Sequence, residues 1–205
     1  MINKIKLNII SNRKLCENEN LEKQIEKIFS AYERKIILKN FEIVALTLRE
    51  KDFNKNEYLK LIEEIYPICQ KYKINLILHQ NYDLNLDDKY KIDGIHLSYS
   101  IFKSLNQNIK AELIKKYKRI GVSIHSLDEA KEVENLGASY VIAGHIFETD
   151  CKKGLKPRGL KFVEDLSSTL SIPIFAIGGI DEKNSLSVID SGAFSVYMMS
   201  TLMKY

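Results

Sequence analysis

Four histidines lie at or near the ends of short apolar runs of the chain. His145 is the strongest candidate for a catalytic group, because it stands directly behind Gly144 and before a long loop. An imidazole takes up and returns a proton near neutral pH, which suits general acid–base chemistry. The alternative is that His145, like His79, His96 and His125, serves only as a hydrogen-bonding residue.

Two pairs of small residues are candidates for binding an anion. Gly178-Gly179 follows an apolar run and precedes Asp181, which can cap a helix. Glycine lets the backbone approach an anion, so that free amides and a helix dipole can bind it. Ser200-Thr201 follows the next apolar run. We expect Gly178, Gly179, Ser200 and Thr201 to bind a phosphate; the alternative for the glycine pair is a tight turn.

Two cations form a second candidate anion site. Arg49 and Lys51 occupy alternate positions after an apolar run, so both side chains can point the same way. They suit a carboxylate or a phosphate, and the alternative is a solvated charged loop. Cys151 is a candidate nucleophile, but the sequence reveals no base partner for it. No H-x₃-H or C-x₂-C spacing supports a zinc site.

These residues follow apolar runs of the length and composition of buried β-strands. Such runs are near-continuously apolar when parallel strands are covered on both faces. Amphipathic stretches separate them, which favours alternating strands and helices. The predicted strands are residues 5–10, 43–48, 74–78, 92–97, 119–123, 140–143, 172–177 and 195–199.

The intervening stretches predict helices of unequal quality. Asn20 is a plausible N-cap for a helix over residues 21–32. A second helix over 58–69 contains Pro67, where we expect a kink or an early end. The polar stretch 82–91 predicts only a degenerate third helix. Further helices are expected over 109–117, from the capping box Ser126-Leu-Asp-Glu129 to Gly137, over 160–170, and from Asp181 to Gly192.

Eight strands with mostly helical connections predict an α/β fold, a single compact (β/α)₈ TIM barrel spanning residues 1–205. The chain is short for this fold, so a doubly wound open sheet is the competitor. The first turn after a strand, Ser11-Asn12-Arg13, lacks the glycine-rich phosphate fingerprint of that alternative. In a barrel, catalytic residues gather at the carboxyl ends of the strands, where all four histidines are predicted to lie.

Composition excludes several classes of protein. The 205 residues carry a net charge of +4, too small and too dispersed to indicate nucleic-acid binding. No apolar run reaches about 18 residues, so we expect no membrane partner. Residues 1–6 lack a signal-peptide core, and three cysteines without framework spacing fit a reduced compartment. We therefore expect a cytoplasmic protein.

The stretch Gly144–Leu160, GHIFETDCKKGLKPRGL, closely resembles the loop of the TenI thiazole tautomerases, which are related to thiamine phosphate synthase. The resemblance covers nearly the whole chain, and its most specific part runs from Gly121 to Leu160. Other matching motifs occur in the expected order: LREK at 48–51, IDGIHL at 92–97, GVSIHS at 121–126, GASYV at 137–141 and AIGGI at 176–180.

The resemblance implies two alternative reactions. Thiamine phosphate synthases join a pyrimidine pyrophosphate to thiazole phosphate with Mg²⁺, using carboxylates at two positions that read Gln80 and Ile101 here. Mg²⁺ needs such hard oxygen ligands. The positions of His145 and Glu148 are usually proline in the synthases, and that of Cys151 is usually Ser or Thr. The tautomerase branch, in contrast, has a catalytic histidine where this chain has His145.

The tautomerase is our main functional hypothesis. It implies that His145 aromatises a carboxylated thiazole phosphate by moving a proton, without a cofactor or a metal; Mg²⁺ enters only with the synthase. Arg49 or Lys51 would bind the carboxylate, and Thr149 and Lys152 of the matching loop would contact substrate. Thr201 departs from the glycine usual in this branch. The implied partner is a small thiazole phosphate, and a homodimer is a family expectation.

A third hypothesis is a non-catalytic, regulatory TenI-like protein. A basic DNA-binding helix would support it. The sequence contains none, and its lysine pairs are dispersed as solvated surface residues usually are.

Overall fold

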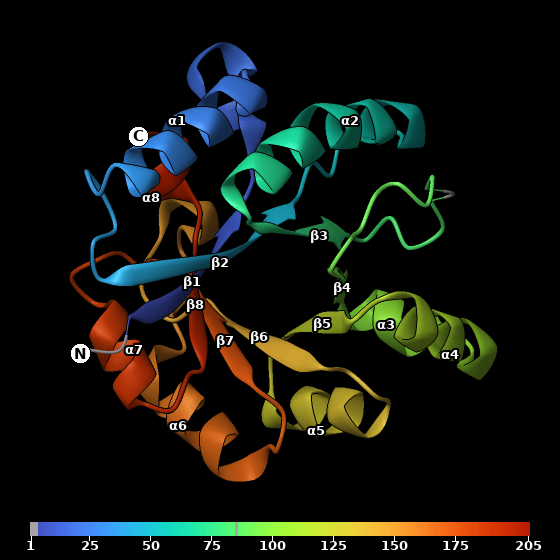
Figure 1. Cartoon of the computed structure of the whole chain (residues 1–205). Coiled ribbons are helices and arrows are strands. Elements are labelled where there is room, and N and C mark those ends of the chain that lie inside the picture. Colours follow the sequence, from blue (N-terminus) through green and yellow to red (C-terminus); the bar gives the residue numbers. More distant parts are fainter. Residues whose placement is uncertain (1–3, 85) are drawn as a thin grey trace.

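The strands described in residues 4–84 and 86–205 of the computed structural model form a closed parallel barrel (Figure 1). Each strand pairs with its successor in the chain, and β8 pairs with β1 to close the ring. The predicted TIM barrel is therefore confirmed, and the open sheet is excluded. The strands are β1 (Ile5–Ile10), β2 (Phe41–Leu48), β3 (Asn75–His79), β4 (Gly94–Ser98), β5 (Arg119–Ile124), β6 (Tyr140–Gly144), β7 (Ile174–Ile177) and β8 (Ser195–Met198).

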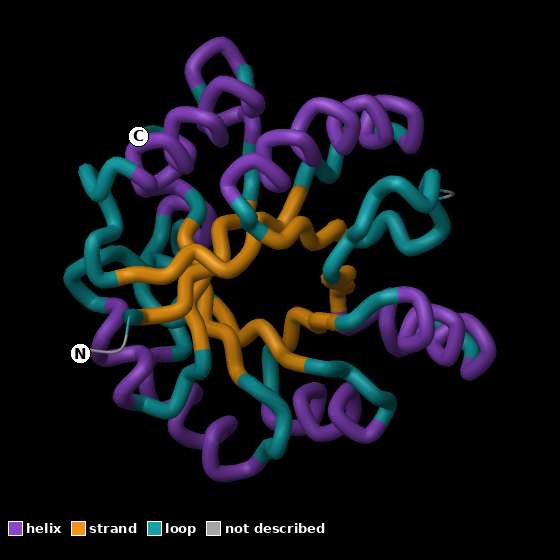
Figure 2. The backbone as a smooth tube through the Cα atoms, viewed as in Figure 1, coloured by secondary structure: helices purple, strands orange, loops and turns teal. Residues whose placement is uncertain are grey.

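Helices form an outer layer around the strands (Figure 2). Between β3 and β4 the described residues 80–84 and 86–93 contain no helix, so the degenerate third helix is confirmed for them; Asn85 lies outside the described residues. The helices are α1 (Leu21–Glu33), α2 (Lys55–Tyr72), α3 (Tyr99–Ser104), α4 (Gln107–Lys116), α5 (Leu127–Asn135), α6 (Gly159–Thr169), α7 (Ser185–Asp190) and α8 (Ser200–Met203), with short 3₁₀ turns η1 (Arg13–Leu15), η2 (Glu17–Glu19) and η3 (Asp150–Lys152).

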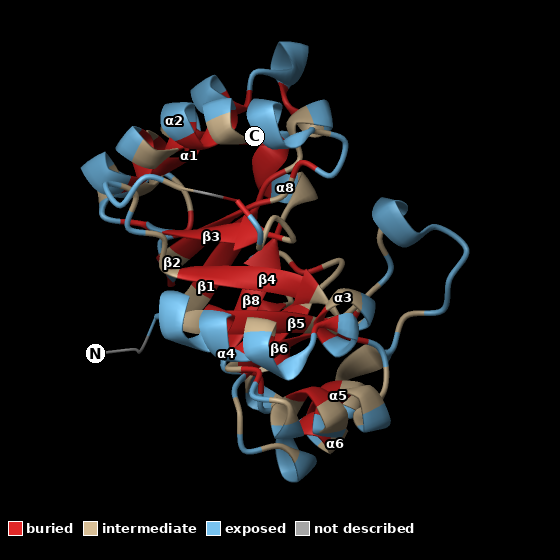
Figure 3. Ribbon diagram, turned by 90° about the vertical axis from the view of Figure 1, so that its right-hand side faces the viewer, coloured by how far each residue is buried: buried red, intermediate tan, exposed pale blue. Residues whose placement is uncertain are grey.

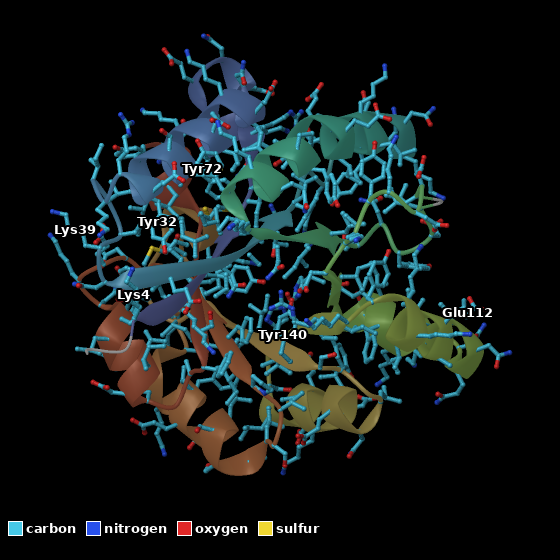
Figure 4. All side chains as sticks on the ribbon, viewed as in Figure 1. Lys4, Tyr32, Lys39, Tyr72, Glu112 and Tyr140 are labelled. Atoms are coloured by element: carbon cyan, nitrogen blue, oxygen red, sulfur yellow. The ribbon has the colours of Figure 1, made fainter. Side chains whose placement is uncertain are left out.

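Two apolar cores hold the barrel together. The larger core lies between the strands and the helices that surround them, and the strands are buried (Figure 3). The smaller fills the barrel interior, where the rings of Tyr140 and Phe175 stack 4.4 Å apart between their centroids. Figure 4 shows Tyr140 within the ring of strands. A Cβ at Gly121 would lie 2.1 Å from the Tyr140 ring, so glycine at that position lets the tyrosine plug the barrel.

The helix boundaries correct several predictions. Two helices, α3 and α4, follow β4 where the pattern predicted one, because Asn106 interrupts the stretch and caps α4 by accepting a bond from the Ile109 amide. Asn20 caps α1 as predicted, through the Lys23 amide. Helix α2 does not end at Pro67 but runs on to Tyr72, so the expected early end was wrong, and the expected kink stays a prediction. Proline there removes only one backbone donor, which the packed helix tolerates.

Two predicted caps also differ. The Ser126 hydroxyl accepts from the Glu129 amide as expected, but the Glu129 carboxylate accepts from the His125 amide, one residue before the predicted donor. Asp181 does not cap α7. Its carboxylate accepts from the Asn184 amide in a turn, and the helix begins at Ser185.

No helix in the described part of the chain is long and apolar enough to cross a membrane. Residues 1–3, part of the N-terminal stretch without a signal-peptide core, lie outside the described residues. That residues 1–205 form a single domain stays a prediction.

Candidate active site

A cavity of about 1360 Å³ opens at the carboxyl ends of the strands. Side chains at the ends of all the described strands, or from the loops that follow them, line it, because a parallel barrel brings every one of those ends to the same face. All four histidines line it. So does every residue proposed from the sequence, namely Arg49, Lys51, His145, Thr149, Lys152, Gly178, Gly179, Ser200 and Thr201.

The twin-glycine turn lies directly against the backbone of the loop that carries His145. Gly178 has φ +104°, and a Cβ there would lie 2.3 Å from the Cβ of His145. A Cβ at Gly179 would lie 2.4 Å from the Glu148 carbonyl oxygen. Only glycine fits both positions, so the absence of two side chains brings the turn and the histidine together.

The expected helix N-terminus behind this turn is absent. Helix α7 begins at Ser185, several residues after Gly179, so its dipole does not start at the turn. Asn184 orders the turn instead: its amide nitrogen donates to the Gly179 carbonyl (2.8 Å), and its amide oxygen accepts from the Asp181 backbone (2.9 Å). The prediction that a helix opens at Asp181, directly behind the glycine pair, was therefore wrong, although the turn itself lines the cavity.

His145 is half-buried at the cavity wall. Its ring nitrogen Nε2 lies 3.2 Å from the carbonyl oxygen of Leu155, across the long loop. Its own carbonyl accepts from the Arg158 amide (2.9 Å), and the Ile146 amide donates to Ile177 of β7 (3.0 Å). The backbone on both sides of the imidazole is thereby fixed to neighbouring segments, which limits how far the ring can move.

A group of cations faces the same cavity. Burial lowers the pKa of the Arg49 guanidinium. The pKa of Lys51 is also lowered, first by partial burial and then by repulsion from Arg49 and Lys152. Among the ion pairs of the described residues, none involves these three side chains. Three cations without an ion-pair partner around one cavity favour an anionic ligand.

Sequence reasoning missed the contacts that hold Arg49. Its amide donates to the Ser11 hydroxyl (2.7 Å), which donates in turn to the buried carboxylate of Glu50 (2.7 Å). The Arg13 amide also donates to Glu50 (3.1 Å). The loops after β1 and β2 are thereby joined. One feature of the sequence could have indicated these contacts. Glu50 stands between two cations in Arg49-Glu50-Lys51, and a carboxylate that does not face the solvent needs hydrogen-bond donors as partners.

Two other histidines form the buried floor of the cavity. His79 and His96 are 8% and 2% exposed, their ring centroids lie 5.6 Å apart, and His96 Nε2 is 2.7 Å from the Ser123 hydroxyl. Burial, and then the charges of His96 and Arg49, lower the pKa of His79 to about 2. Burial, and then Arg49, lower the pKa of His96 to about 3. Both rings are neutral at physiological pH.

Two remaining candidates lie on the rim. His125 is exposed, and its backbone amide, not its ring, makes the contact to Glu129. The Cys151 sulfur lies 3.6 Å from the Ser200 hydroxyl, at the edge of the predicted phosphate site. Within residues 4–84 and 86–205, no group of three or more His, Cys, Asp or Glu side chains is arranged to bind a metal ion.

A family model described as thiamine monophosphate synthase matches residues 7–202. This chain belongs to the thiamine monophosphate synthase family. The chain is 29% identical to the thiamine-phosphate synthase of Clostridium acetobutylicum, over 97% of this chain and 87% of that protein. It is 31% identical to putative thiamine-phosphate synthase 2 of Aquifex aeolicus, over 83% and 87%.

The barrel of this family member also resembles a solved structure. It superimposes on the thiamine phosphate pyrophosphorylase of Pyrococcus furiosus with a TM-score of 0.77 at 24% identity, covering 99% of this chain and 89% of that one. At this identity the likeness supports the fold alone. The superfamily expected from the sequence is confirmed. The curated relatives, however, carry the name of the synthase rather than that of the tautomerase branch.

The buried histidines predict that this family member loses stability in mild acid. Because the folded pKa values of His79 and His96 are far below the unfolded value of about 6.5, only the unfolded chain takes up their protons as the pH falls. Stability is fully retained above about pH 6.5 and declines below it, by up to about 1.4 kcal/mol per pH unit for each ring. Urea unfolding measured from about pH 7.5 to about pH 4.5 checks this.

The double variant His79→Asn/His96→Asn should take up about two fewer protons on unfolding at the acid end of that range. His125→Asn is the matched control, because His125 is exposed and should leave the slope unchanged. A double variant with the slope of the natural protein would contradict the prediction.

Proposed function

We propose that this chain is an enzyme of thiamine biosynthesis, and specifically a thiazole tautomerase that aromatises a carboxylated thiazole phosphate. The observation that carries the proposal is the position of His145 against Gly178, in a cavity that also contains Arg49, Lys51 and Lys152. A proton carrier beside an anion-binding turn, with cations in the same cavity, suits a small heterocycle that has two anionic groups.

The two anionic groups would bind to different parts of the cavity. The phosphate would bind at the turn of Gly178 and Gly179 and at Ser200 and Thr201, which line the cavity together. The carboxylate would bind to the cations Arg49 and Lys51, whose pKa values are lowered first by burial. Lys152 and Thr149 come from the loop after β6 and would complete this side. Two-point binding would hold the ring beside His145.

The reaction is then a proton shift. His145 removes the proton from the ring carbon that bears the carboxylate, and the C–H electron pair enters the conjugated ring. The exocyclic double bond shifts into the ring, and the exocyclic carbon takes the proton back from the imidazolium. The protein ends in the protonation state in which it began. General acid–base catalysis of this kind is worth about 10² to 10⁴ in rate.

A synthase is the second candidate, and the names of the relatives favour it. That reaction would join a pyrimidine pyrophosphate to thiazole phosphate with Mg²⁺. The residues do not fit the metal well. Gln80 lines the cavity where the synthases have a carboxylate, and Ile101 packs against the core. The acidic residues of the cavity lining are Glu148, Asp150 and Asp181, after β6 and β7. We derive no step through a metal.

The first experiment is turnover by His145→Gln. The variant should keep the fold, because the ring is half-buried and lines the cavity, and should lose at least about a hundredfold in rate. Aromatisation of the non-aromatic thiazole carboxylate phosphate is followed by absorbance. His125→Gln is the control, because it changes an exposed histidine that follows the neighbouring strand β5 and has no role in the proposed reaction. Turnover by His145→Gln equal to that of the natural protein would remove the mechanism.

The second experiment separates the two candidates. The purified protein is given pyrimidine pyrophosphate, thiazole phosphate and Mg²⁺, and thiamine phosphate is measured. We expect no Mg²⁺-dependent product above the level without protein. Product formation that a chelator abolishes would establish the synthase instead. A homodimer and a cytoplasmic location stay predictions.

A further inference from the structure

We propose that the backbone carbonyl of Leu155 fixes the tautomer of His145. Nε2 keeps its hydrogen, and Nδ1 is the nitrogen that takes up and returns the proton of the substrate. The proposal rests on the proposed function, because it names the basic atom of that reaction. It adds Leu155 as a positioning residue that acts through its main chain.

The decisive contact joins the two sides of the long loop. His145 Nε2 lies 3.2 Å from the Leu155 carbonyl oxygen. A carbonyl oxygen can only accept a hydrogen bond, so Nε2 must carry the hydrogen. In a neutral imidazole only one nitrogen is protonated, and the lone pair is therefore on Nδ1.

The backbone of the loop holds Leu155 in place. Its amide donates to the Lys152 carbonyl (3.0 Å), and the Lys152 amide donates to the Thr149 carbonyl (3.0 Å). Gly154, with φ +82°, makes the turn that directs the chain back toward His145. The Leu155 side chain is 60% exposed, so packing does not position this residue. The loop therefore presents a carbonyl group rather than a side chain to the imidazole.

The far end of the same loop is tied to the histidine as well. The Arg158 amide donates to the His145 carbonyl (2.9 Å), and the Arg158 guanidinium donates to the Gly144 carbonyl (3.1 Å). The loop thus leaves the barrel at His145 and returns to it. Its contacts constrain the backbone and one ring nitrogen of the same residue.

This tautomer has a chemical consequence. Nδ1 is the ring nitrogen nearer to Cβ, and the Cβ of His145 lies against Gly178. The reacting carbons would therefore have to lie within reach of Nδ1 rather than of Nε2. When Nδ1 accepts the proton from the ring carbon, the Nε2–H bond to Leu155 becomes charge-assisted and stabilises the imidazolium. The same Nδ1 then returns the proton to the exocyclic carbon, and no other acid or base is required.

Nitrogen-15 NMR of the substrate-free protein tests the tautomer directly. Spectra are recorded in alkaline buffer, and the His145 signals are assigned by their loss in His145→Gln. We expect a protonated Nε2 and an unprotonated Nδ1. A protonated Nδ1 in the natural protein would overturn the proposal whatever the activity.

A pair of glycine variants tests whether the loop imposes this tautomer. Gly154→Ala strains the backbone of the turn before Leu155, because φ is +82° there. The strain is the only effect of the substitution, since the added methyl would meet no atom within 4 Å. Gly159→Ala is matched to it, with φ +72° and an equally open Cβ, but it lies at the other end of the loop, where α6 begins. Its amide donates to the Ile146 carbonyl (3.0 Å), and alanine keeps that donor.

Gly154→Ala should mix the two tautomers and lower kcat by about tenfold or more with little change in KM, because the basic atom is displaced while the anion sites remain. Gly159→Ala should keep both the tautomer and kcat. The proposal is overturned if Gly154→Ala keeps the natural tautomer and rate, or if both variants lose rate equally with the tautomer unchanged. If the natural protein aromatises the substrate but has its proton on Nδ1, this inference fails and the proposed function stands. If the proton is on Nε2 but the protein does not aromatise the substrate, the proposed function fails.

Discussion

The site depends on the close approach of two backbone segments, the turn at Gly178 and the loop at His145. A side chain at Gly178 would place its Cβ 2.3 Å from that of His145, far inside van der Waals contact. Backbone hydrogen bonds hold the two segments at this separation: Ile146 donates to Ile177, and Phe147 donates to Gly178, both at 3.0 Å. The turn proposed to bind the phosphate and the histidine proposed to carry the proton are thereby joined without any side chain between them.

The other side chains of the cavity form a neutral part and a positively charged part. Neutral imidazoles of His79 and His96 form a buried floor, because burial and nearby cations make their protonation unfavourable. The positive charge is concentrated on Arg49 and its neighbours, and the Ser11–Glu50 contact ties the backbone of Arg49 to the first loop. His145 is the histidine that is neither buried in the floor nor exposed on the rim.

The barrel and the membership of its rim were predictable, because parallel strands have a strong apolar signal and their carboxyl ends must meet. That is why Gly178, Ser200 and Arg49, far apart in the sequence, were expected in one cavity and line it. Local caps were less predictable. Asp181 and Asn184 are both good capping residues, and only the three-dimensional turn decides which one orders the chain before α7.

The least predictable contacts use main-chain atoms. The carbonyl of Leu155 and the amide of Arg49 have no signature in residue type, so the sequence cannot reveal what they bind. The choice between two reactions of one family has a similar origin. It depends on a few positions, such as Gln80 and His145, against a background of similarity that the whole family shares.

Turnover of the thiazole substrate by Gly178→Ala tests the central claim most directly, with circular dichroism to verify that the barrel still folds. The added methyl must push the His145 loop away from the turn, and a displacement of about 1 Å costs roughly a hundredfold in rate. The account predicts a folded protein with at least that loss. A folded Gly178→Ala that turns over substrate as fast as the natural protein would contradict it.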